Sequence, residues 1–81
     1  MNKIIIDGLK VNEKKDIYIP FREKYEELYG NNLDALDEVL NYIDESLEVS
    51  LVNKNKLREK LGDFYYNSFI EVLDDNNIKH N

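Results

Sequence analysis

The most constraining feature of this sequence is the change in the spacing of its apolar residues. Residues 3–6 (KIII) form a short β-branched run before an Asp-Gly turn, and residues 46–52 (SLEVSLV) alternate apolar and polar side chains. Both patterns are typical of strands, the first buried and the second with one face more exposed. The apolar residues between them recur at helical spacing. Strands separated by helices favour a parallel sheet, because parallel neighbours need a long crossover connection.

The first helical segment is predicted from about Tyr18 to Leu28. Pro20 suits its first turn, where a missing N–H group costs nothing, and Gly30 suits a left-handed stop after its end. The apolar residues that define its inner face are Ile17, Phe21, Tyr25 and Leu28.

The second helical segment is predicted to begin near Asn31 or Asn32 and to end at about Ile43. Either asparagine can accept a hydrogen bond from an N–H group of the first turn. With Asn31 as the cap, Asp34 is the third helical residue and faces the positive end of the helix dipole. The inner face of this helix consists of Leu33, Leu36, Val39, Leu40 and Ile43.

The rest of the chain predicts a short helix before Gly62, a longer helix over residues 63–75 and a short last strand around Ile78. The element order is then β-α-α-β-α-α-β. This order predicts an α/β fold with a small three-stranded parallel sheet and three to four helices packed on it. The length favours a single domain over residues 1–81, and most of the aromatic side chains are expected in its core.

The negative charge is concentrated in the middle of the chain. Eight acidic residues and no basic residue lie between Lys24 and Lys54, whereas the rest of the chain has more basic than acidic residues. Such a segment repels nucleic acid and attracts basic partners, although it can also be a solvated face that keeps the protein soluble. The N-terminal apolar run is too short for a signal peptide or a membrane span, and there is no cysteine. A cytoplasmic protein with no membrane partner is therefore expected.

Glu38 is the acidic residue that helix stability explains least. It lies one turn after Asp34 on the same side, and like charges at this spacing repel each other. Asn41, Tyr42 and Glu45 continue the same outer side, and no lysine is close enough to relieve the repulsion. This pattern favours a basic partner.

Residues that would support an enzyme are few. The only histidine, His80, is next to the last residue, where it is expected to be a tail residue. The sequence has no cysteine nucleophile and no glycine-rich phosphate loop. The acidic pairs are expected on exposed helix faces, where they are poor general acids or bases, and their spacing does not fit a calcium loop. We therefore expect no enzymatic activity, no metal and no cofactor.

One stretch resembles a known family. Residues 29–36 (YGNNLDAL) resemble the Tyr-Gly-x-Asn-Leu-Asp-Ala-Leu signature of barstar-like ribonuclease inhibitors. The stretch IIIDG resembles the first strand and turn of that family, and SFIEVL, with Glu71, resembles its last helix. The element order predicted above also agrees with that fold, so the resemblance covers most of the chain.

The resemblance implies an intracellular inhibitor, or immunity protein, that plugs the basic active site of a bacterial ribonuclease. The second helix and the loop before it would enter that site, and the protein would act as a monomer. Glu38 stands where the family has its central aspartate, and Asp34 and Glu71 match supporting acids. The expected partner-binding residues are Tyr29, Gly30, Asn32, Asp34, Glu38, Tyr42 and Glu71.

Three positions depart from the family pattern. Glu38 is one methylene longer than the usual aspartate, Asp37 stands where barstar has a tryptophan, and Leu28 stands where it has a contacting tyrosine. These departures leave open a cognate partner other than barnase. The alternative function is a barstar-like interaction module that regulates another toxin or a nucleic-acid enzyme and inhibits no ribonuclease.

Overall fold

The computed structural model describes residues 2–43 and 46–81. Within these ranges the chain forms three strands, four α-helices and one 3-10 helix. Asp44 and Glu45 lie outside the described residues, so the expected place of Glu45 on the outer side of the second helix is not addressed. In chain order the elements are β1 (Asn2–Asp7), η1 (Lys14–Tyr18), α1 (Ile19–Lys24), α2 (Leu33–Tyr42), β2 (Leu47–Val52), α3 (Lys54–Leu61), α4 (Asp63–Asp75) and β3 (Lys79–His80).

The three strands form one parallel sheet in the order β1-β2-β3. Ile4 is opposite Val49, and Glu48 is opposite Lys79. The α/β class, the parallel sheet and the number of helices agree with the prediction. A short last strand was predicted around Ile78, and β3 contains only Lys79 and His80. His80, next to the last residue, is part of that strand, and its Nε2 atom lies 2.8 Å from Asp74 Oδ1.

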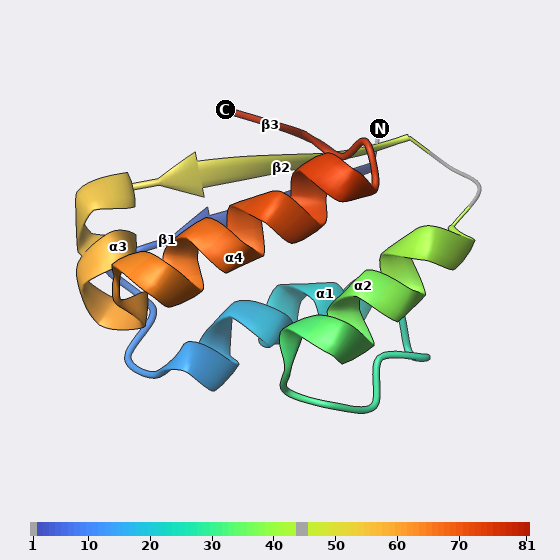
Figure 1. Cartoon of the computed structure of the whole chain (residues 1–81), viewed down its shortest axis with the longest axis horizontal. Helices are drawn as coiled ribbons and strands as arrows, with labels where there is room; N and C mark the ends of the chain where they lie inside the picture. The colour runs from blue at the N-terminus through green and yellow to red at the C-terminus, as the bar shows by residue number, and fades with distance from the viewer. Residues whose placement is uncertain (1, 44–45) are drawn as a thin grey trace.

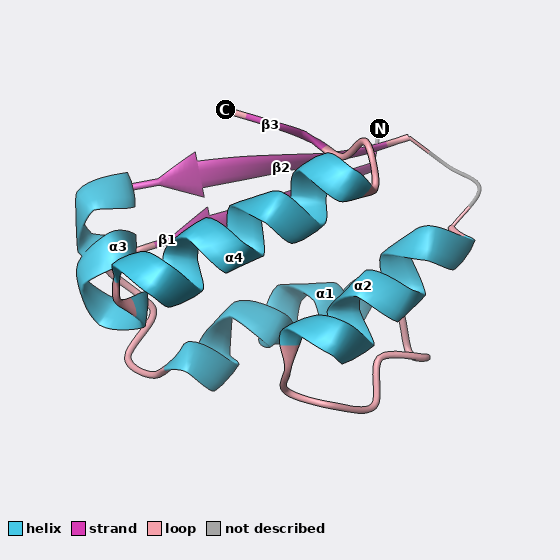
Figure 2. Ribbon diagram, in the orientation of Figure 1, coloured by secondary structure: helices cyan, strands magenta, loops and turns pink. Residues whose placement is uncertain are grey.

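The helices cover one face of the sheet (Figure 2). Ile4 and Ile6 of β1 and Leu47, Val49 and Leu51 of β2 are at most 4% exposed and point into the core, whereas the other residues of these two strands are exposed or half-buried. The α4 helix runs along the sheet, α1 contacts β1, and α2 packs against α4 (Figure 1). Gly8 follows β1, and a Cβ atom there would lie only 2.3 Å from the Asn53 carbonyl oxygen, so this turn requires glycine.

The core is rich in aromatic side chains, as the composition suggested. Phe21 of α1 meets Phe69 of α4 edge to face, with ring centroids 6.2 Å apart, an arrangement that aromatic pairs favour. Tyr18 is fully buried, and its hydroxyl group hydrogen bonds to that of Tyr65. Burial, with this hydrogen bond as a smaller cause, raises the pKa of Tyr18 above its ordinary value. Three aromatic residues are instead well exposed, namely Tyr29, Tyr42 and Phe64.

The first helical segment differs from its prediction. It begins earlier, as the 3-10 helix η1, and α1 ends at Lys24 rather than at Leu28. Tyr25 has an extended backbone, with φ −123° and ψ 98°. Leu28 still reaches the core, with 1% of its surface exposed, but it does so from a loop. The apolar spacing was therefore correct about burial and wrong about the backbone that produces it.

No helix in the described part of the chain has the length and hydrophobicity needed to cross a bilayer.

Candidate functional site

The N-terminus of α2 is fixed by the side chain of Asn32. Its Oδ1 atom accepts a hydrogen bond of 2.8 Å from the Ala35 N–H group, as a helix cap does. Asn32 rather than Asn31 is the cap, so Asp34 is the second helical residue and not the third. Asp34 still lies in the first turn, where a carboxylate interacts favourably with the helix dipole.

The loop before α2 is held by Arg22 of α1. The Arg22 guanidinium donates hydrogen bonds of 3.1 Å to each of the Leu28 and Gly30 carbonyl oxygens. It also donates one of 2.5 Å to the Asn31 side-chain oxygen. This charged donor satisfies two loop carbonyl oxygens that have no helical partner. The loop therefore has a defined shape despite lacking regular secondary structure.

Gly30 does not have the role predicted from the sequence. Among the glycines of the described residues, only Gly62 has a positive φ, so Gly30 is not a left-handed helix stop. A Cβ atom at Gly30 would lie 3.0 Å from Asn32 Nδ2 and 3.2 Å from Ala35 Cβ. Both distances are shorter than ordinary contacts. The position therefore favours glycine because the loop passes close to the first turn of α2.

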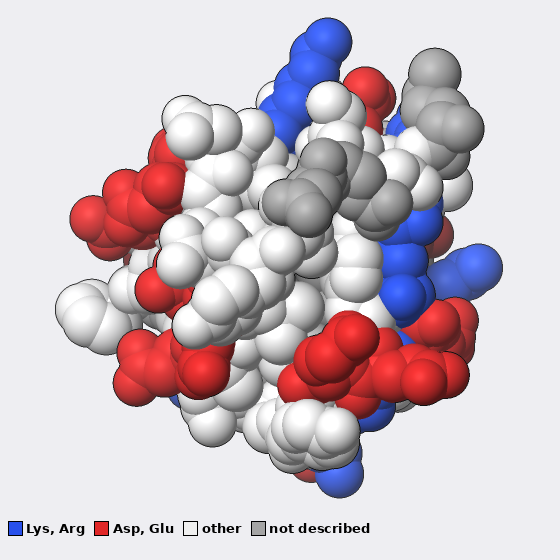
Figure 3. Space-filling view, turned by 90° about the vertical axis from the view of Figure 1, so that its right-hand side faces the viewer, with Lys and Arg blue, Asp and Glu red and all other residues white. Residues whose placement is uncertain are grey.

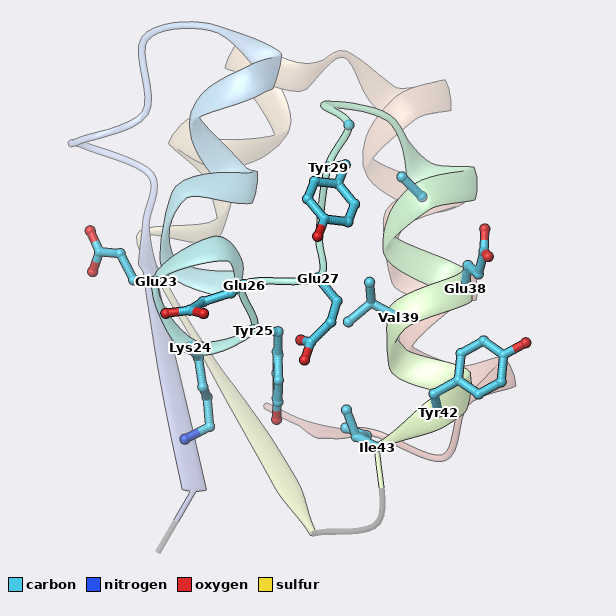
Figure 4. Close-up of a pocket in the computed structure, with 12 residues that line it drawn as sticks. Glu23, Lys24, Tyr25, Glu26, Glu27, Tyr29, Glu38, Val39, Tyr42 and Ile43 are labelled. Carbon is cyan, nitrogen blue, oxygen red and sulfur yellow. The ribbon is translucent and has the colours of Figure 1, made fainter.

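A groove lies between this loop and α2 (Figure 4). Its volume is about 1000 Å³. Ala35 and Val39 of α2 and Ile43, directly after it, form an apolar wall, and Tyr29 and Gly30 contribute from the loop. The remaining residues that line it are Glu23, Lys24, Tyr25, Glu26, Glu27, Glu38 and Tyr42.

The groove brings together four of the seven residues expected from the sequence. Tyr29, Gly30, Glu38 and Tyr42 line it, and Figure 4 shows the Glu38 and Tyr42 side chains pointing outward from α2. The other three lie elsewhere. Asn32 caps α2, Asp34 is exposed on its first turn, and Glu71 is exposed on α4, which packs against α2.

Two acidic residues of this region, Glu26 and Glu27, were not selected from the sequence as site residues. They were predicted to lie inside a helix, whereas they are exposed in the loop and line the groove. One feature of the sequence could have identified them as site residues, namely their position in the acidic segment between Lys24 and Lys54, which has no basic residue. Among the described residues on the face at the C-terminal end of α2, acidic side chains lie on both sides of a stretch of uncharged ones (Figure 3).

Asp37 and Glu38 are neighbours in sequence but have different surroundings. Asp37 Oδ1 accepts a hydrogen bond of 2.7 Å from Asn76 Nδ2, at the end of α4. Glu38 is exposed, and no ion pair in residues 2–43 and 46–81 involves it, Glu26 or Glu27. Asp37 therefore contributes to the packing of α2 on α4, whereas Glu38 is available to a partner.

The described residues contain no group of three or more acidic, histidine or cysteine side chains arranged to hold a metal ion. The arrangement that the groove offers is a surface of exposed carboxylates and tyrosines beside an apolar wall, which suits the binding of a protein.

Comparison with known proteins agrees with the fold and with the signature before α2. No curated protein sequence matches the chain significantly. The family described as "Barstar (barnase inhibitor)" matches residues 1–80, which is nearly the whole chain. The match includes the signature in residues 29–36, all three strands and all the helices described above. The chain therefore belongs to the Barstar family of barnase inhibitors.

Proposed function

We propose that this protein inhibits a basic bacterial ribonuclease by covering its active site with α2 and the loop before it. The observation that carries this proposal is the family match over residues 1–80. Glu38 supports the proposal, since it is exposed near the middle of α2 and forms no ion pair among the described residues. It can pair with a cation of the partner without first breaking an ion pair within the protein.

Each expected site residue has a role in this proposal. Glu38 is the central acid and pairs with the basic groups that bind substrate phosphates in the enzyme. Asp34 and Glu71 add negative charge on either side, and Tyr29 and Tyr42 supply exposed aromatic surface. Gly30 and Asn32 act indirectly, since they set the shape of the loop and the start of α2.

The proposal includes a monomeric protein in the cytoplasm that performs no chemistry of its own. Acidic helices on its surface would steer the basic enzyme into contact and exclude nucleic acid by repulsion. Size-exclusion chromatography and cell fractionation test the monomeric state and the location.

A second candidate is the inhibition of a different toxin or nucleic-acid enzyme. Leu28 stands where the family has a contacting tyrosine, but it is only 1% exposed and makes no contact available to a partner. Asp37 replaces a tryptophan and is bonded to Asn76. Both positions favour a partner whose surface differs from that of barnase.

The deciding experiment is capture of the partner from the source bacterium with the immobilised protein, followed by a ribonuclease assay on the captured protein. Inhibition at one-to-one stoichiometry supports the first candidate. A captured partner without ribonuclease activity, or with another nuclease activity that the protein blocks, favours the second. Addition of the protein to barnase itself shows whether the departures at Leu28, Asp37 and Glu38 still permit that pairing.

A further inference from the structure

The two walls of the groove differ in chemistry. The wall along α2 is apolar and consists of Ala35, Val39 and the C-cap residue Ile43, which are half-buried against the core. The opposite side is the loop, from which Glu27 and the 91% exposed Tyr29 extend into the space between loop and helix (Figure 4). A ligand that fills this groove therefore needs an apolar part against α2 and a cationic part near the loop.

The single basic residue in the lining does not satisfy this acidic side. The amine of Lys24 donates a hydrogen bond of 3.0 Å to Asn2 Oδ1 on β1. It also lies 5.9 Å from the centre of the Tyr25 ring. Its charge is thus turned toward β1 rather than toward Glu27. Glu27 is exposed and takes part in no ion pair among residues 2–43 and 46–81.

We propose that this groove holds an arginine side chain of the protein partner. The arginine methylenes lie against Tyr29 and Val39, and its guanidinium pairs with the Glu27 carboxylate, which Figure 4 shows directed away from Tyr29 and toward Ile43. Arginine fits better than lysine, because its planar fork matches a carboxylate and it is less strongly hydrated than an ammonium group.

This inference rests on the proposed function, since it assumes that a basic protein docks on the α2 side of the molecule. It adds a second point of contact to that proposal. Figure 4 shows Glu38 pointing outward from α2 and Glu27 lying on the inner side. The partner would therefore meet Glu38 with one surface and insert the arginine beside α2 with a neighbouring segment. Glu27 and Tyr29 then determine which partners are accepted.

The test is an NMR titration of the isotope-labelled full chain with the peptide acetyl-Gly-Arg-Gly-amide. The control peptide replaces arginine by citrulline, which has the same shape without the charge. We expect the arginine peptide to shift the backbone amide signals of the loop and of the Val39–Ile43 turn, and the citrulline peptide to shift them much less. Glu27→Gln is expected to weaken arginine binding by about two- to fivefold, the effect of one partly exposed ion pair.

Asp75→Asn is the matched control variant, because it removes one exposed carboxylate far along the chain on α4 and outside the groove. Equal effects of Glu27→Gln and Asp75→Asn would overturn the inference. So would shifts scattered over all exposed acidic residues, or equal shifts with citrulline. Inhibition assays are separate from this titration. Peptide binding in the groove without any inhibited ribonuclease would refute the proposed function alone, and inhibition without peptide binding would refute the arginine site alone.

Discussion

Asn76 Nδ2 donates a hydrogen bond of 2.7 Å to Asp37 Oδ1 and so connects the end of α4 to α2. The same nitrogen donates to the Val72 carbonyl oxygen at 2.9 Å. The contact supplements the burial of Leu36 and Leu40, which turns one face of α2 toward the core. With Asp37 directed toward α4, its neighbour Glu38 points to solvent.

The two neighbours should therefore respond differently to truncation. We expect Glu38→Ala to weaken partner binding by about thirtyfold or more, as for a central charged residue of an interface. Asp37→Ala should leave binding almost unchanged and lower the free energy of unfolding by about 0.5–1 kcal/mol, through loss of one hydrogen bond. Titration calorimetry and urea unfolding measure the two effects. Equal losses of binding in the two variants would refute the proposed orientation of α2.

Arg22 should control the loop that precedes α2. Arg22→Ala removes three hydrogen bonds to that loop, so we expect faster hydrogen exchange at residues 28–31 and faster dissociation of the partner. Arg22→Lys should recover only part of the effect, because an ammonium group cannot reproduce the guanidinium fork. Lys56→Ala, on α3, is the control for loss of a positive charge.

The direction of the Arg22 effect separates shape from charge. Removal of a cation from an acidic protein should speed its association with a basic partner. If Arg22→Ala and Lys56→Ala gave the same small increase in association rate and no change in dissociation, Arg22 would have no role in positioning the loop.

The cap of α2 predicts a difference between two adjacent asparagines. Asn32→Ala should lower the free energy of unfolding by about 1 kcal/mol, which corresponds to a fall in Tm of about 4–8 °C for a chain of this size. Asn31→Ala loses only a side-chain bond to Arg22 and should have a smaller effect. Calorimetric melting of both variants makes the comparison. A larger loss from Asn31→Ala would place the cap at Asn31.

Association with the partner should depend on salt. The exposed carboxylates of α2 and of its preceding loop attract a basic protein over a distance that salt shortens. The association rate should therefore fall by about tenfold or more as ionic strength rises from about 0.01 M to 1 M, while dissociation changes little. Stopped-flow mixing over a salt series measures both rates. An association rate that did not change with ionic strength would show that electrostatic attraction does not accelerate the encounter with the partner.

Acid should destabilise the fold partly through Asp16. Backbone N–H groups of Asn12 and Glu13 donate hydrogen bonds to Asp16 Oδ2 at 2.9 and 3.0 Å, and they hold the pKa of Asp16 below its ordinary value. Because the folded-state pKa is the lower one, the stabilisation is present above the unfolded-state pKa and is lost as pH falls through the folded-state value.

The same reasoning gives the test. Asp16→Asn removes this titration, so its free energy of unfolding should fall less steeply than that of the unmodified chain between about pH 5 and pH 2. Urea unfolding at a series of pH values compares the two slopes. Parallel pH profiles would show that Asp16 does not contribute to acid unfolding.

The sequence alone determined the class of fold and the location of most elements. Three local patterns predicted an element that the structure contains. They are the β-branched run at residues 3–6, the alternation at residues 46–52 and the apolar face of residues 63–75, which correspond to β1, β2 and α4. The signature in residues 29–36 identified the family and the region expected to meet a partner. Local patterns sufficed for these features because neighbouring residues decide them.

Only the tertiary structure decided the shape of the site. Leu28 has helical spacing but reaches the core from a loop, which the Arg22 guanidinium holds through hydrogen bonds to the Leu28 and Gly30 carbonyl oxygens. The loop in turn creates the groove and exposes Glu26 and Glu27, which the sequence placed in a helix. The contact of Asp37 with Asn76 likewise joins residues far apart in the chain. Apolar spacing shows which side chains are buried, but side-chain hydrogen bonds between distant segments determine which backbone conformation buries them.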